Sequence, residues 1–165
     1  MPPIYTNEKI CDIYSRNIDT VYRICFIFMK SHTQDLEDAI QTTFLNMLSS
    51  GKTFESKDHE KAWLIVTASN VCKNMLAQGW RRKVKLQEML SPDQTIIEPQ
   101  FEIDETLNNV MALPDRYKTA VYLHYYNGYT GVEIAKLLGK SESTVWGYLH
   151  KGRKLLKSLC QEEEE

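Results

Sequence analysis

The residues most suited to chemistry lie near the C-terminal end of the chain, where hydroxyl and basic side chains share one short segment. Ser141 is a natural N-cap for a helix whose first turn would carry outward Glu142, Ser143, Thr144 and Trp146. Five basic residues and one acid give the segment from Lys140 to Ser158 a local charge of +4. Polar side chains read base edges and basic ones hold phosphates, so the chemistry of this segment is that of duplex DNA binding.

The elements that must position these side chains have the spacing of a helix-turn-helix. Ala135, Gly139 and Val145 mark its three constrained positions. The small residue lets the second helix cross closely over the first, the glycine can take the positive φ of the turn, and the branched residue fills the gap between the helices. An ordinary helical hairpin would show the same three residues, so the spacing alone leaves both interpretations open.

A second basic segment, from Val71 to Leu86, has a local charge of +5 and contains no acid. It overlaps the end of a helix predicted from about Glu60 to Gly79 and runs into Trp80, Arg81 and Arg82. Aromatic rings stack on any base while basic side chains hold the backbone, which suits single-stranded or melted nucleic acid. The alternative is a solvated helix end, because cations are favoured at helix C-termini.

The whole chain of 165 residues has a net charge of −2, because acids elsewhere offset the two basic segments. This distribution predicts two DNA contacts and weak binding by the protein alone. The chain has no apolar run of membrane-spanning length, no signal-like N-terminus and four scattered cysteines, so we expect a cytoplasmic protein with reduced thiols and no membrane insertion. No nucleophile-base pair, phosphate-binding glycine loop or metal-ligand set is visible, so no enzyme, cofactor or metal site is expected.

Helical periodicity extends through most of the remaining sequence. We predict helices over residues 7–29, 34–48, 101–112 and 116–126. The apolar stripe of the second helix is predicted to contain Leu36, Ile40, Phe44, Leu45 and Leu48. Ser91-Pro92-Asp93 and Glu98-Pro99 break helices, so residues 87–100 are predicted to be a flexible linker. The predicted fold class is all-α, with two small helical domains, the C-terminal one a helix-turn-helix domain.

Several segments, in this order, resemble a known family. Residues 35–45 resemble the core-binding helix of bacterial sigma factors, and residues 62–70, followed by Arg81-Arg82, resemble their promoter-melting helix. Residues 112–117, 133–135, 143–145 and 149–155 are similar to their promoter-binding domain. The resemblance covers nearly the whole chain and points to the extracytoplasmic-function group of the sigma-70 family.

The resemblance implies a domain organisation and a function. Residues 1–86 would form a region 2 domain that binds core RNA polymerase and the −10 element, and residues 101–165 a region 4 domain that binds the −35 element and carries an acidic tail. The protein would direct promoter-specific initiation and aid promoter melting. Its partners would be core RNA polymerase, promoter DNA and an anti-sigma factor.

The resemblance also implies roles for individual residues. Core polymerase would be bound around Asp35, Asp38, Gln41 and Phe44. A base flipped from the −10 element would be captured near Phe54 and Asn70, and the non-template strand would be held by Asn74, Gln78, Trp80, Arg81 and Arg82. The −35 element would be contacted by Ser143, Thr144, Trp146, Gly147, His150 and Lys151, with phosphates held by Arg153 and Lys154.

This sequence departs from the family pattern at a few positions. Ser69 stands where a basic residue is usual, and Gly152 replaces a common alanine. Basic or polar residues are usual at the positions of Trp146, Gly147 and Tyr148. Two other functions remain open from the residues. One is a stand-alone helix-turn-helix repressor that binds a palindromic duplex without polymerase, and the other is a sigma-like decoy that sequesters an anti-sigma factor.

Overall fold

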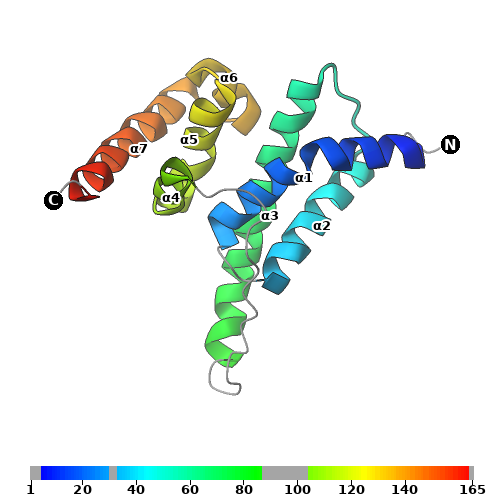
Figure 1. The fold of residues 1–165 in the computed structure, drawn as a ribbon, viewed down its shortest axis with the longest axis horizontal. Coiled ribbons are helices and arrows are strands. Elements are labelled where there is room, and N and C mark those ends of the chain that lie inside the picture. The colour runs from blue at the N-terminus through cyan, green and yellow to red at the C-terminus, as the bar shows by residue number, and fades with distance from the viewer. Residues whose placement is uncertain (1–4, 30–32, 87–103, 164–165) are drawn as a thin grey trace. The chain divides into compact units, whose positions relative to one another are not determined.

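The computed structural model describes residues 5–29, 33–86 and 104–163, and omits the side chains of Thr33, residues 80–86 and residues 160–163. The predicted linker and the end of the acidic tail lie outside the described residues, as do the side chains of Trp80, Arg81 and Arg82. Within those ranges the chain forms seven helices and no strand (Figure 1). The all-α prediction is confirmed. The chain divides into two compact units, Met1–Phe101 and Glu102–Glu165.

The first unit contains three helices, α1 (Asn7–Met29), α2 (Thr33–Ser50) and α3 (Lys57–Leu86). Each packs on the other two, and the side chains that meet between them are fully buried. This core includes Val21, Ile24 and Ile27 of α1, Leu36 and Met47 of α2, and Leu64, Ile65 and Cys72 of α3. The C-terminal turns of α3 extend beyond α1 and α2 (Figure 1), as expected of a helix of 30 residues, about 45 Å long.

The α3 helix begins earlier than its apolar pattern predicts. The predicted polar loop, residues 52–59, ends at Ser56, whose side chain accepts a hydrogen bond from the His59 backbone N–H at 3.1 Å. The Ser56 carbonyl accepts the Glu60 N–H at 3.1 Å. Ser56 therefore acts as an N-cap, and the first turn of α3 is polar because it precedes the residues that face the core.

The predicted apolar stripe of α2 is wrong at one position. Leu36, Ile40 and Phe44 are buried, but Leu45 is 60% exposed. Leu45 follows the fully buried Leu36 by nine residues, which at about 100° per residue places it on the opposite side of the helix. Leu45 lies on the outer surface of the unit.

The second unit contains α4 (Glu105–Met111), α5 (Asp115–Asn127), α6 (Gly131–Leu138) and α7 (Glu142–Glu163). The shorter α4 starts later than predicted, because the Asp104 side chain caps it by accepting the Leu107 N–H at 2.7 Å. Leucines and branched residues from all four helices fill the core. They are Leu107, Val110, Val121, Leu123, Ile134, Val145 and Leu149.

Gly152 has a packing role that its helix propensity does not show. It is buried in the middle of α7, where α7 crosses α5. A Cβ at this position would lie 2.6 Å from Val121 Cγ2. The glycine therefore allows a close approach of the two helices, which offsets the roughly 1 kcal/mol that it costs relative to alanine in a helix.

This packing predicts that Gly152→Ala destabilises the second unit by about 1–2 kcal/mol, because the overpacking penalty exceeds the gain in helix propensity. Hydrogen exchange on the full chain, resolved to residues 104–163, measures the change. Val121→Ala in the same chain removes the clashing methyl group, so the double variant should be less destabilised than the sum of the single variants. Additive single effects would contradict a contact between these two positions.

Candidate nucleic-acid interface

Three of the predicted −10 contacts lie on one exposed face of α3. Asn70, Asn74 and Gln78 are all exposed and follow one another at intervals of four residues, which places them in a single row. The opposite face carries Ala68 and Cys72 and is fully buried. Three side-chain amides therefore form a polar strip that can donate to and accept from the edges of bases. Arg81 and Arg82 continue the same helix beyond the described side chains.

An aromatic pair begins this strip. Phe54, in the loop before α3, lies 5.7 Å from Trp63, measured between ring centroids, with the ring planes at 57°. Trp63 is partly exposed and stands seven residues before Asn70, about 10 Å along the same face of α3. Phe54 also lines an open cavity of about 270 Å³, together with Tyr5, Lys9, Asp12, Arg16 and Glu60.

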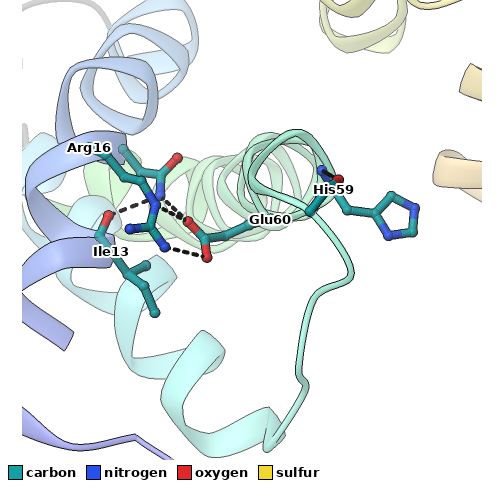
Figure 2. Close-up of polar contacts among 6 residues, drawn as sticks. Ile13, Arg16, His59 and Glu60 are labelled. Carbon is teal, nitrogen blue, oxygen red and sulfur yellow. Dashed lines mark hydrogen bonds and ion pairs between the residues drawn. The ribbon is translucent and has the colours of Figure 1, made fainter. Parts of the chain in front are cut away.

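A buried carboxylate holds this end of α3 against α1 (Figure 2). Glu60 is 5% exposed. It accepts two hydrogen bonds from the Arg16 guanidinium, at 2.8 and 2.9 Å, and one from the Asn17 amide at 2.7 Å. The hydrogen bond to Glu60 raises the pKa of Arg16. Figure 2 shows His59, the preceding residue, pointing away from the pair.

The predicted polymerase-binding residues of α2 differ in exposure. Asp38 and Gln41 are exposed, Asp35 is half-buried, and Phe44 is only 9% exposed. The Phe44 ring lies 4.9 Å from the ring of Tyr14, which is 47% exposed. Phe44 therefore supports a surface formed by Tyr14 and its neighbours, and does not itself present a face to a partner.

The helix-turn-helix forms as the sequence predicts. Gly139 has φ of 65° and ends α6, while Ala135 and Val145 are buried, at 5% and 0% exposure, between the helices. The Ser141 side chain accepts the Thr144 N–H at 3.2 Å, which confirms Ser141 as the N-cap of α7. The structure adds a capping box at the other helix, where Thr130 and Glu133 exchange side-chain and backbone hydrogen bonds.

The α7 helix presents a polar face away from this core. Val145, Leu149 and Gly152 are buried. The opposite face carries the predicted −35 contacts, of which Ser143, Thr144, His150, Lys151 and Lys154 are exposed and Gly147 is half-buried. Hydroxyl groups, an imidazole and amines thus share one helix face, which suits base edges and phosphates.

Three predicted residues of the second unit make specific contacts. Arg153 donates to the Tyr125 hydroxyl at 3.3 Å, across to α5. Trp146 is 52% exposed and contacts Gly131 at the start of α6. His124, which the sequence predicts to be structural, is paired through Nδ1 with the Tyr129 carbonyl at 2.9 Å. His124 fixes the turn before α6 and lies outside the polar face of α7.

The structure groups the predicted residues into three surfaces, two on the first unit and one on the second. It also identifies contributors that the sequence prediction missed, namely Asn17, Glu60, Thr130, Gly131 and Glu133. The Thr130-x-x-Glu133 pattern is a readable capping-box signal, whereas the Asn17 and Glu60 contacts span 43 residues and leave no local pattern. Among the described residues, no cluster of His, Cys, Asp and Glu could hold a metal ion.

Comparison with known proteins assigns both units to one family. The family model for sigma-70 region 2 matches residues 13–82, and that for sigma-70 region 4 matches residues 105–156. The ECF RNA polymerase sigma factor SigM of Bacillus subtilis is 30% identical over 165 aligned residues, which cover 91% of this chain and 94% of SigM. SigX of the same organism is 28% identical, over 96% of this chain and 87% of SigX.

A solved structure shares the fold. It is the sigma factor RpoE in complex with the anti-sigma factor NepR from Bartonella quintana, with a TM-score of 0.63 and 18% identity over 90% of this chain and 94% of the RpoE chain. The chain belongs to the sigma-70 family of RNA polymerase sigma factors, in the extracytoplasmic-function group. It binds core RNA polymerase and directs promoter-specific initiation of transcription. None of its described helices is long and apolar enough to span a bilayer.

The Glu60 contacts predict that Glu60→Ala destabilises the first unit by about 1–3 kcal/mol, since Asn17 loses a partner in a buried position. Hydrogen exchange resolved to residues 5–86 of the full chain measures the loss. Glu55→Ala, at an exposed position five residues earlier, provides the matched control and should change stability by no more than about 0.5 kcal/mol. Equal effects of the two substitutions would show that the buried contacts contribute nothing.

Two glycines of the helix-turn-helix give a second prediction. A Cβ at Gly147 or at Gly139 would have no neighbour within 4 Å, so the two positions differ mainly in backbone conformation. Gly147→Ala should stabilise the second unit by about 1 kcal/mol, because Gly147 lies inside a helix. Gly139→Ala should destabilise the unit by about 1–2 kcal/mol, because alanine is strained at a φ of 65°. Hydrogen exchange of residues 104–163, measured on the full chain as temperature rises, checks that the two substitutions change the free energy of unfolding of this unit in opposite directions.

Proposed function

We propose that this sigma factor divides promoter recognition between its two helical units. Residues 1–86 act as the region 2 domain, which binds polymerase and the −10 element, and residues 101–165 act as the region 4 domain, which binds the −35 element. Residues 87–100 connect them. The exposed amide strip of α3 and the exposed polar face of α7 support this assignment, because each presents base-reading groups on one side of a helix.

The polymerase contact is assigned to the outer surface of α2. Asp38 and Gln41 offer a charge and an amide, and Asp35 lies one turn earlier. Tyr14, held by Phe44, and the exposed Leu45 add apolar area beside them. A surface that combines apolar area with a polar rim has the composition of a stable protein interface.

The melted −10 element is assigned to the face of α3 that runs from Trp63 to Gln78. Opening a duplex without ATP requires extruded bases to gain stacking and hydrogen bonds. Phe54, tilted against Trp63 beside the open cavity, supplies the aromatic surface, and Asn70 supplies a side-chain amide on the same face of α3. Asn74 and Gln78 then follow the non-template strand toward Trp80, Arg81 and Arg82.

The −35 element is assigned to α7. The major groove is contacted by Ser143, Thr144, Trp146, Gly147, His150 and Lys151, and phosphates are held by Arg153 and Lys154. The exposed positions of the hydroxyl and amine groups support this arrangement. Phosphate contacts carry no sequence information, so removing these basic residues should weaken binding to all sequences by about the same factor.

Further properties belong to the same proposal. The protein works in the cytoplasm, where polymerase acts, and has no catalytic centre or cofactor of its own. An anti-sigma factor restrains it. The solved RpoE neighbour, which was crystallised with the anti-sigma factor NepR, supports that partner through the shared fold.

The observation that carries this function is the row of exposed amides on α3, and a transcription assay tests it. Wild-type protein added to core polymerase should produce transcripts from specific start sites, whereas the protein without polymerase should bind the same promoters poorly. Asn70→Ala should reduce binding of the holoenzyme to a promoter fork with a single-stranded −10 element by about fivefold, the effect of one lost hydrogen bond.

Ser15→Ala provides the control, because Ser15 is an exposed polar residue of α1 outside the three surfaces. It should leave initiation and fork binding unchanged. A chain that yields no specific transcript with core polymerase, but binds a palindromic duplex tightly without it, would be a stand-alone repressor and would contradict the proposed function.

A further inference from the structure

A half-exposed tryptophan lies beside the polar face of α7. Trp146 keeps 52% of its surface exposed, and Val132, on α6, is 40% exposed. The other exposed residues at the start of α7 are Glu142, Ser143 and Thr144, all of them polar. Single exposed apolar side chains are common on protein surfaces, so the exposure of Trp146 gains meaning only from its place beside the polar face and from the way its ring is held.

The indole is held in place by a glycine. A Cβ at Gly131 would lie 2.7 Å from Trp146 Cε2, 2.8 Å from Cζ2 and 3.1 Å from Cδ2. These distances are too short for any side chain, so the ring lies directly over the Gly131 backbone at the start of α6. Gly131 itself is buried beneath it.

This contact fixes the ring before any partner arrives. Tryptophan has two side-chain torsions, so seating one part of its ring on α6 leaves little conformational freedom to lose on binding. The exposed part of the ring is then a preformed apolar surface next to Ser143 and Gly147. On a helical projection Trp146 lies on the flank of α7 that faces α6, at the edge of the polar face.

The chemistry of duplex DNA limits what such a surface can recognise. The bases offer one apolar group in the major groove, the 5-methyl of thymine, and the deoxyribose of the backbone offers another that carries no sequence information. An indole has no charge to pair with a phosphate, and its one polar group, the Nε1–H donor, can make a single hydrogen bond, so most of its surface can gain only from apolar contact. The methyl group is therefore the sequence-specific ligand that fits.

We propose that Trp146 reads the 5-methyl group of a thymine in the −35 element and that Gly131 is the positioning residue that holds the indole for this contact. The inference rests on the proposed function, because it requires α7 to lie in the major groove. It adds a chemical preference at one base pair and a role for Gly131.

Selection from promoters with a randomised −35 element tests the preference. Wild-type holoenzyme should enrich thymine at one position, and holoenzyme carrying Trp146→Ala should lose that enrichment while still selecting the other positions. Leu155→Ala is the matched control, because Leu155 is also exposed, at 40%, on α7 but lies more than two turns away. It should keep the thymine preference.

Replacing the selected thymine by uracil removes the methyl group alone. Wild-type holoenzyme should bind the uracil promoter about fourfold more weakly, the effect of one buried methyl group. The Trp146→Ala holoenzyme should bind both promoters equally. Equal binding of the thymine and uracil promoters by the wild type would overturn the methyl contact. If Trp146→Ala then still weakened binding to all promoter sequences, the indole would pack on deoxyribose instead.

Gly131→Ala tests the positioning role. In the wild-type chain it should abolish the uracil effect, and in the Trp146→Ala chain it should cause no further change in promoter selection. A retained uracil effect in Gly131→Ala would overturn the role of the glycine. Absence of any −35 selection by wild-type holoenzyme is a different result, because it would contradict the proposed function itself.

Discussion

The contact between the buried Glu60 carboxylate and α1 is the interaction on which the first unit depends. A buried carboxylate is costly unless charged and hydrogen-bonding partners surround it, and Arg16 and Asn17 meet that requirement from one turn of α1. Because Glu60 lies in the first turn of α3, the contact fixes where that helix starts. The loop before it then brings Phe54 onto Trp63, and the exposed amides follow at set intervals.

The second unit depends on the backbone conformation of its turns and on the close approach of its helices, whereas the first depends on the ion pair of Glu60. Gly139 turns the chain between α6 and α7, and the side chains of Thr130 and Ser141 cap the starts of the two helices by accepting backbone N–H hydrogen bonds. Gly152 lets α7 lie close to α5, which sets how α7 is rotated about its axis. That rotation decides which residues of α7 are exposed, so the small residues on its inner side control the polar surface on its outer side.

Local patterns predicted much of this architecture. The periodicity of residues 7–29 gave the bounds of α1, and Gly139 with Ser141 gave the turn, because each signal is contained within a few neighbouring residues. Contacts between distant residues could not be predicted in this way. The burial of Glu60 depends on Arg16 and Asn17 in another helix, and the need for Gly152 depends on a valine 31 residues earlier. The roles of the predicted site residues remain predictions, since exposure alone assigns no ligand.

The contact between the Trp146 ring and the Gly131 backbone limits which substitutions the two positions can accept during evolution. A mutation that gives position 131 a side chain is harmful while the indole is present, and one that removes the indole exposes a bare stretch of α6 backbone. Drift at the two positions is therefore coupled, so related chains should exchange both residues together. A single substitution at either position would then lose the thymine preference, whereas a new side chain held against α6 in place of the indole would require linked substitutions at both positions.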